Sequence, residues 1–90
     1  MTELQQIEQQ LQENNLAEAL AAADRYLAAH PDSAEAHFLR GKIYWRQGNR
    51  SAATTDYATA ASLDPASSAV EALALARSVA DFFNPDIFNP

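Results

Sequence analysis

The 90-residue chain contains no cysteine, only two glycines, and only six lysines and arginines against twelve aspartates and glutamates. Without cysteine it has neither disulfides nor a thiolate nucleophile. The net charge of −6 argues against nucleic acid as a partner, because nucleic-acid binding needs a basic face. Two glycines are too few for a glycine-rich phosphate-binding loop.

Long hydrophobic runs and strand patterns are also missing. No stretch approaches eighteen consecutive apolar residues, so we expect no transmembrane helix and no membrane partner. No basic segment leads into an apolar stretch near the start, which favours a cytoplasmic protein without a secretory signal. No alternation of β-branched residues indicates a strand. Because 48% of the residues are hydrophobic and many of these are alanine, the best helix former, the sequence predicts one all-α domain.

Candidate catalytic and metal-binding residues are few. His30 and His37 are seven residues apart with a proline between them, so they do not form a metal pair on one helix face. Asp32 and Glu35 nearby would complete only a loose site. Serine and threonine occur without a nucleophile elbow or a flanking His–Asp arrangement, and we expect most carboxylates to be exposed on helix surfaces. We therefore predict no enzyme activity, no metal and no cofactor.

The segment from Ala34 to Pro65 carries the strongest pattern in the chain. Gly41 lies inside a predicted helix, where glycine costs about 1 kcal/mol relative to alanine. Its presence predicts a close approach to the following helix, where Ala53 faces it. Ala60 is similarly small. We expect the larger side chains of Tyr44, Tyr57 and Leu63 to fill the space between these close contacts. The pattern predicts a hairpin of two helices over about 34–47 and 50–63.

This spacing resembles the tetratricopeptide repeat (TPR), a helix–turn–helix unit of about 34 residues. The matching features are Gly41-x-x-Tyr44, Gly48-Asn49 at the turn, Ala53-x-x-x-Tyr57-x-x-Ala60, and Leu63-Asp64-Pro65 at the exit. His37 stands where the family usually has Trp, and Arg40 stands where it usually has Leu. The resemblance implies a right-handed α-solenoid that acts as a binding scaffold, and it leaves the partner unnamed.

An earlier, degenerate repeat fits residues 1–33. Moving back 34 residues takes Pro65 to Pro31 and Ala53 to Ala19. Asn14 then lies at the turn, and Asn tolerates the left-handed conformation that Gly usually supplies there. We expect helices over about 2–13 and 16–29.

The predicted organisation is a first repeat over about 1–33, a second over about 34–67, a capping helix over about 68–83 and an Asn-Pro-rich aromatic tail over 84–90. Thr2 with Gln5 predicts a capping box at the first helix. Ser33 or Asp32 is expected to cap the third helix. The fifth helix contains Val70, Leu73, Leu75, Val79 and many alanines. This helix is less polar than the last helix of a repeat array should be, so we expect another segment to cover it.

The last ten residues are a tandem duplication, Asp-Phe-Phe-Asn-Pro followed by Asp-Ile-Phe-Asn-Pro. Because Asn-Pro disfavours helix at the Asn, the fifth helix should stop near Phe83. A large apolar side chain contributes about 1.5–3 kcal/mol when fully buried. We therefore expect the tail to dock on its own domain or on a partner, rather than form a disordered end with exposed apolar side chains. The residues assigned to tail docking are Phe82, Phe83, Ile87 and Phe88.

The resemblance also implies a binding surface, since the first helices of TPR repeats line a concave groove that receives an extended peptide or a helix. Carried over to this chain, the central partner-binding residues are Leu4, Leu11, Phe38, Lys42, Trp45 and Arg46. Further groove positions are Glu8, Gln12, Glu35, Ala69, Ala72, Ala76 and Val79. The clamp with which some TPR proteins hold acidic chaperone tails is absent, because its positions here are Leu4, Glu8, Leu39, Ala69 and Leu73.

Two features of this surface have alternative interpretations. Lys42, Arg46 and Arg50 follow one side of a helix and its end. They either hold an acidic peptide or form local ion pairs with Glu35 and neighbouring acids, which stabilise little at an exposed site. Trp45 either contacts a partner directly or packs beneath the tail.

We therefore expect a non-enzymatic protein–protein interaction module that binds a peptide or partner segment in the groove. The alternative is a self-assembly element whose aromatic tail docks in its own groove or in that of a neighbouring chain, which would allow a homodimer.

Overall fold

The computed structural model describes the backbone of residues 1–82 and the side chains of residues 1–78, and all regular structure in that part of the chain is helical. The five helices are α1 (Glu3–Gln12), α2 (Leu16–Ala29), α3 (Ala34–Arg46), α4 (Arg50–Leu63) and α5 (Ala69–Phe82). Every helix expected from the sequence is present, with ends at or next to the expected residues. The all-α fold class is confirmed.

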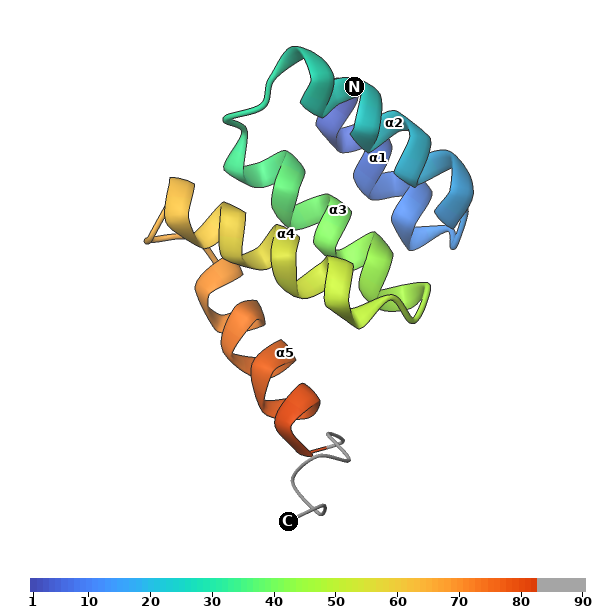
Figure 1. Cartoon of the computed structure of the whole chain (residues 1–90). Coiled ribbons are helices and arrows are strands. Elements are labelled where there is room, and N and C mark those ends of the chain that lie inside the picture. The colour runs from blue at the N-terminus through green and yellow to red at the C-terminus, as the bar shows by residue number, and fades with distance from the viewer. Residues whose placement is uncertain (83–90) are drawn as a thin grey trace.

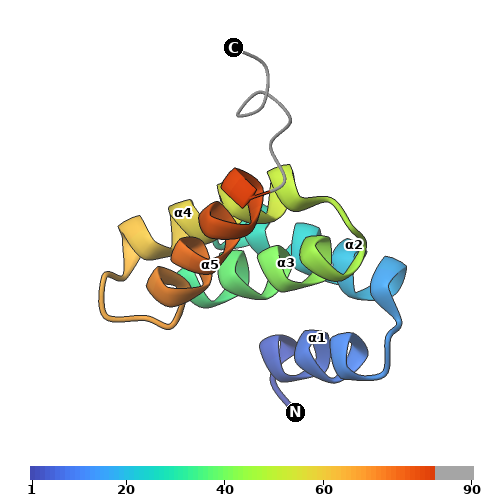
Figure 2. The ribbon, with the colours of Figure 1, turned by 90° about the horizontal axis from the view of Figure 1, so that it is seen from below.

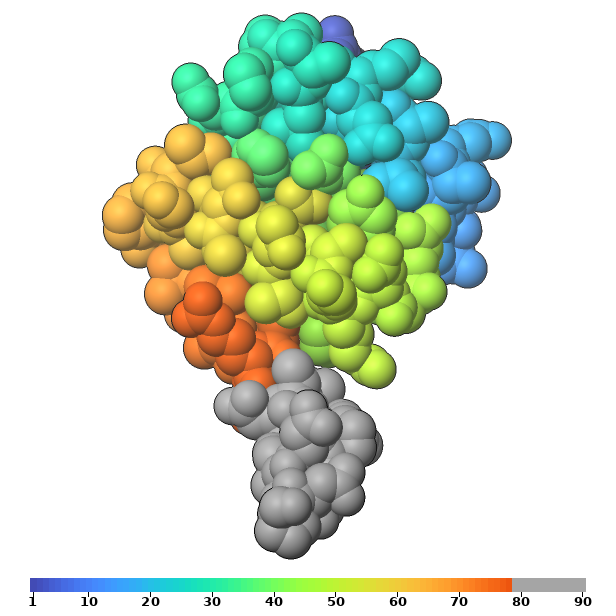
Figure 3. Space-filling model, in the orientation of Figure 1, coloured from blue at the N-terminus to red at the C-terminus, as the bar shows by residue number. Residues whose placement is uncertain are grey.

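The helices pack in chain order (Figure 1). α1 packs with α2 and α3 packs with α4, while α2 joins the two pairs through α3 and α5 packs against α4. α1 and α5 lie at opposite ends of the array. Seen from below, α1 and α4 lie on opposite sides of α3 (Figure 2). The face shown in Figure 3 is formed mainly by α2 and α4, the second helices of the two pairs.

Local capping interactions fix where α1 and α3 begin. Gln5 N–H donates to Thr2 Oγ1 (3.2 Å) and Thr2 N–H donates to Gln5 Oε1 (3.0 Å), so the predicted capping box is present. At α3, Ala36 N–H donates to Ser33 Oγ (3.2 Å), so Ser33 is the cap. Each cap satisfies a backbone N–H group that has no partner within its helix.

The turns inside the two helix pairs have the same geometry. Asn14 has φ 63° and Gly48 has φ 83°, so both occupy the left-handed region, as expected from the sequence. In the first turn, Asn15 N–H donates to Gln10 O (2.8 Å), and in the second, Asn49 N–H donates to Tyr44 O (2.9 Å). These are the long hydrogen bonds of a Schellman motif. The two turns are thus equivalent elements at the same point of successive helix pairs.

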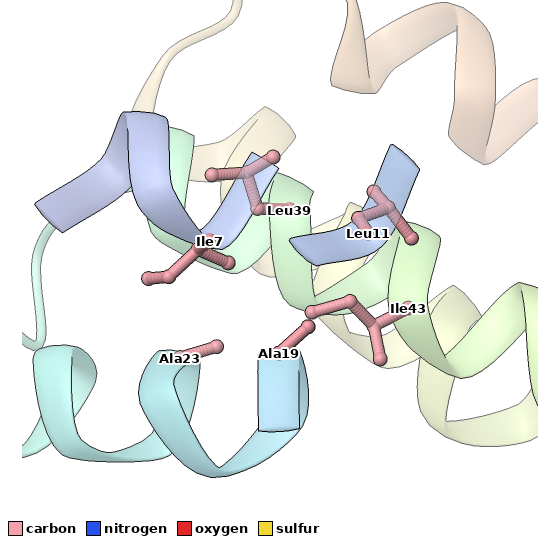
Figure 4. Close-up of a cluster of buried hydrophobic side chains, with 6 residues drawn as sticks. All are labelled: Ile7, Leu11, Ala19, Ala23, Leu39 and Ile43. Atoms are coloured by element: carbon pink, nitrogen blue, oxygen red, sulfur yellow. The ribbon is translucent and has the colours of Figure 1, made fainter. Parts of the chain in front are cut away.

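One core cluster joins α1, α2 and α3 (Figure 4). Bulky side chains from α1 and α3 meet small side chains of α2, and the buried members are Ile7, Leu11, Ala19, Ala23, Leu39 and Ile43. The expected inward residues Leu20 and Tyr26 are half-buried at the edge of this cluster, and Leu27 is buried. The alanines of α2 let three helices approach one another around a thin core.

The close approach predicted at Gly41 is the central contact between α3 and α4. A Cβ atom at Gly41 would lie 2.6 Å from Tyr57 Cε1, 2.7 Å from Tyr57 Cδ1 and 3.3 Å from Ala53 O. Ala53 and Ala60 are fully buried and Tyr57 is nearly so. Tyr57 therefore supplies the expected bulk, with a half-buried Tyr44 beside it. Leu63 does not, since it lies at the last residue of α4 and is 41% exposed.

We predict that Gly41→Ala destabilises the fold even though alanine favours helix by about 1 kcal/mol. The added methyl group must displace a buried ring, and overpacking of this kind costs about 1–3 kcal/mol. The measurement is chemical denaturation of the wild type and the variant. In a Tyr57→Leu background the same substitution should cost less, because the ring is gone. Equal costs in both backgrounds would contradict the proposed contact.

Candidate functional site

A cleft of about 290 Å³ lies between α1 and α3, and we call it the α1–α3 cleft. It is lined by Glu8, Leu11, Gln12, Lys42, Trp45, Arg46 and Tyr57. The α1 residues are spaced i, i+3 and i+4, and the α3 residues repeat this spacing, so each set forms one helix face. The cleft exists because these two faces meet.

A second, smaller hollow of about 160 Å³, the α5 pocket, is lined by Trp45, Tyr57, Ala72, Leu75 and Ala76. Trp45 and Tyr57 line both hollows, so the two adjoin. Together they form what we call the groove, which draws side chains from α1, α3, α4 and α5. The α5 pocket is mostly apolar, whereas the α1–α3 cleft combines apolar and charged side chains.

The structure brings four of the six residues predicted to bind a partner to the α1–α3 cleft, and these are Leu11, Lys42, Trp45 and Arg46. Leu4 instead lines a separate hollow with Tyr26 and Glu35 near the start of α1. Phe38 is half-buried and packs on the ring of Tyr57, with 5.8 Å between ring centroids.

The sequence interpretation placed Tyr57 in the core and missed its place in the groove. The signal was Gly41, because a residue without a side chain leaves room for the Tyr57 ring between α3 and α4. Burial raises the pKa of Tyr57, and the nearby charge of Asp56 raises it further. The phenol therefore stays neutral across the physiological range and offers the groove an aromatic ring without a charge.

The basic strip is formed by Lys42, Arg46 and Arg50. Lys42 Nζ lies 4.8 Å from the centroid of the Phe38 ring, and Arg50 Cζ lies 5.1 Å from that of Trp45. Arg46 Nη1 donates to the main-chain oxygen of Leu11 (2.6 Å), which ties α3 to the end of α1.

Within the described side chains, the ion pairs involve none of these three residues. The local ion pairs with Glu35, one of the two interpretations, are not observed there. The strip holds half of the six basic residues in a chain of net charge −6, and aromatic rings position two of its three charges.

The structure describes helix α5 but not the side chains assigned to tail docking. Phe82 ends α5, but its side chain and that of Val79 lie outside the described part, as do all of Phe83, Ile87 and Phe88. Ala69 and Ala76 are buried, and Ala72 and Leu73 are half-buried. Leu75 is 67% exposed and Val70 is 43% exposed. Within residues 69–78, α5 therefore keeps Leu75 exposed at the α5 pocket and Val70 exposed on another side of the helix.

A polar cluster, the Asp56 cluster, lies away from the groove lining and consists of Asp24, His37, Arg40 and Asp56. Asp56 is only 3% exposed, which corrects the expectation of solvated carboxylates at this position. Arg40 donates to both of its oxygens, through Nε to Oδ2 (2.8 Å) and Nη2 to Oδ1 (2.9 Å). Arg40 Nη1 also donates to Asp24 (3.0 Å).

The two residues that depart from the TPR pattern, His37 and Arg40, both contact Asp56. The hydrogen bonds to Asp56 raise the pKa of the Arg40 guanidinium against the opposing effect of burial. His37 thus belongs to this cluster, and no group of three or more metal-ligating side chains is assembled within the described residues.

Comparisons with known proteins agree with this architecture of paired helices around a groove. The family model of the tetratricopeptide repeat matches residues 4–68, and the chain belongs to this family. TPR proteins are binding scaffolds that generally mediate protein–protein interaction. No curated protein matches the chain significantly. Within residues 1–82, the helices are too short or too polar to cross a bilayer.

A solved structure supports the same fold. The chain is similar to protein BF1650 of Bacteroides fragilis, whose structure was determined in solution by NMR. The two are 29% identical, the match covers 99% of this chain and 91% of that chain, and the TM-score is 0.86.

We predict that Asp56→Ala lowers the free energy of unfolding by about 3 kcal/mol, because removing one partner of a buried pair leaves the other uncompensated. Asp24→Ala is the matched control, since its side chain contacts the same arginine but is 53% exposed. An exposed pair contributes about 0–1 kcal/mol. Denaturation of both variants measures the difference, and similar losses would contradict the burial argument.

Proposed function

We propose that the groove binds a segment of a partner protein that carries a bulky apolar side chain close to an acidic one. The observation behind this proposal is that Trp45, Lys42 and Arg46 line one cleft. Membership of the TPR family leads us to expect protein binding in general. The side chains that line the groove indicate which kind of partner segment would fit.

The apolar half of the proposal rests on Trp45. Trp45 lines both hollows and is half-buried. The exposed part of its ring can therefore contact a partner while the rest stays packed in the domain. Trp, Tyr and Arg are the residues most often found to dominate binding energy at protein interfaces. An apolar side chain entering the α5 pocket would also contact Leu75, whose exposed surface would then be removed from water.

The acidic half rests on charge. Lys42 and Arg46 line the cleft without a carboxylate partner among the described side chains, although Glu8 lies on the opposite face. The chain as a whole is acidic, so an acidic segment is repelled elsewhere and attracted at the strip. Complementary charge of this kind mainly sets orientation and association rate. We therefore expect binding to weaken as ionic strength rises.

Selection of peptides from a random display library on the full chain tests this function. Selected peptides should combine an aromatic or large aliphatic residue with Asp or Glu, and bind with Kd on the order of micromolar, as expected for a small interface. Trp45 is the one tryptophan in the sequence, so its fluorescence reports occupancy directly.

We predict that Lys42→Glu weakens binding of the selected peptides about tenfold or more, a loss of about 1.4 kcal/mol. Arg25→Glu is the matched control, because it makes the same charge change at an exposed position of α2 outside the groove. Calorimetric titration measures both variants. Equal losses would indicate a general charge effect, and no loss at Lys42 would place the binding site elsewhere.

A second candidate function, self-assembly, is favoured by the exposed Leu75 and Val70 on α5. Here the aromatic tail of one chain, with Phe83, Ile87 and Phe88, would cover the exposed Leu75 and the groove of another. This interpretation requires the full chain to associate, whereas peptide binding by the first candidate needs only a monomer.

If the chain self-assembles, we predict that light scattering shows a dimer for the wild type and a monomer for the Leu75→Glu variant. Ala74→Glu adds the same charge at the neighbouring exposed position and serves as the control. Phe88→Ser in the full chain tests the contribution of the tail. A monomer over the whole range of accessible concentrations would exclude this candidate.

A further inference from the structure

Four residues that have no part in the groove lining meet in the Asp56 cluster, and two of them, His37 and Arg40, are the departures from the family pattern. We propose that His37 is a proton-dependent tie within the fold. In its doubly protonated form it bridges the turn before α3 to the buried carboxylate of α4, and loss of one ring proton releases that bridge. This inference does not depend on the proposed binding function.

The His37 ring faces an oxygen atom on each of its two nitrogens. Nε2 lies 2.9 Å from the main-chain oxygen of Pro31, and Nδ1 lies 3.3 Å from Asp56 Oδ1. A carbonyl oxygen and an ionised carboxylate can only accept hydrogen bonds. A neutral imidazole carries one N–H group, so it satisfies one of these acceptors and turns a lone pair toward the other. Only the imidazolium donates to both.

The charges around the ring support the same protonation state. From α4 the ring faces Asp56, on its own helix α3 it has Arg40, and α2 contributes Asp24 through Arg40. The preceding turn supplies the Pro31 oxygen. With His37 protonated, the cluster has two positive and two negative groups. With His37 neutral, one negative charge is left without compensation near the nearly buried Asp56.

Arg40 opposes the proposal, since its guanidinium repels a second cation. It is, however, already engaged with both oxygens of Asp56 and with Asp24. The carboxylate oxygen Oδ1 is shared between Arg40 and His37. Asp56 therefore contacts both cations, and Asp24 adds a second negative charge beside Arg40, so that attraction to the carboxylates offsets the repulsion.

The sign of the pH dependence follows from this arrangement. Histidine is the side chain whose charge ordinarily changes between about pH 5 and 8. Both ring N–H groups of the imidazolium have an acceptor in the folded chain, and the unfolded chain holds neither acceptor in place. The stabilisation by the tie is therefore complete at the acid end of this range and is lost as the pH rises. The tie fixes the start of α3, the helix that carries Lys42 and Trp45 to the groove.

The first experiment is thermal unfolding of the full chain and of His37→Gln at about pH 5.5 and about pH 8. We expect His37→Gln to lower the Tm by roughly 4–8 °C at the lower pH and by clearly less at the higher pH. His30→Gln is the matched control, because His30 is exposed and its ring lies against Tyr26 rather than a carboxylate. A His37→Gln loss that is the same at both pH values would overturn the proposal.

A second experiment needs no variant and decides the question even if His37→Gln fails to fold. Long-range nitrogen–proton NMR of the ring resolves whether each nitrogen carries a hydrogen. At about pH 5.5, the acid end of the ordinary histidine range, we expect hydrogens on both Nδ1 and Nε2 of His37 in the folded chain. A bare Nδ1 there would overturn the tie, because the contact with Asp56 would then be made by a lone pair.

Discussion

The contact between Gly41 and the ring of Tyr57 is the constraint on which the rest of this structure depends. Because Gly41 has no side chain, the ring enters between α3 and α4, close to the main chain of α3. From there the same ring lines both the α1–α3 cleft and the α5 pocket. The packing of α3 on α4 and the shape of the groove thus have one cause. A substitution that disturbs this packing therefore also changes the groove.

Helix α3 separates its charged residues into two groups by the direction in which they face. Arg40 points to carboxylates of α2 and α4 and is neutralised there, while Arg46 lines the cleft and contacts the end of α1. This difference matters because a neutralised, partly buried cation holds helices together, whereas a cation without a carboxylate partner is available to a ligand. A helix packed on three sides can serve both purposes only when its polar residues are divided in this way.

The sequence could predict the parts of the fold that are set by local chemistry. The capping box at Thr2, the left-handed turns at Asn14 and Gly48, and the close approach at Gly41 each depend on residues near in the chain or on a fixed repeat spacing. The place of Asp56 could not be predicted in the same way, because its burial requires Arg40, sixteen residues away, and a helix packing that creates the low-exposure site. For the groove, helical spacing was enough to place Lys42, Trp45 and Arg46 on one face of α3. Leu4 lies elsewhere, because the orientation of α1 is set by tertiary packing.

Helix α5 has two roles, one in packing and one in lining the groove. Its Ala69 and Ala76 are buried, which closes the second helix pair, while Leu75 remains exposed at the α5 pocket. A ligand that binds only the folded form stabilises it in proportion to the logarithm of its concentration relative to Kd. If a segment occupies the α5 pocket, it removes the exposed surface of Leu75 from water, so binding and the stability of α5 are thermodynamically coupled.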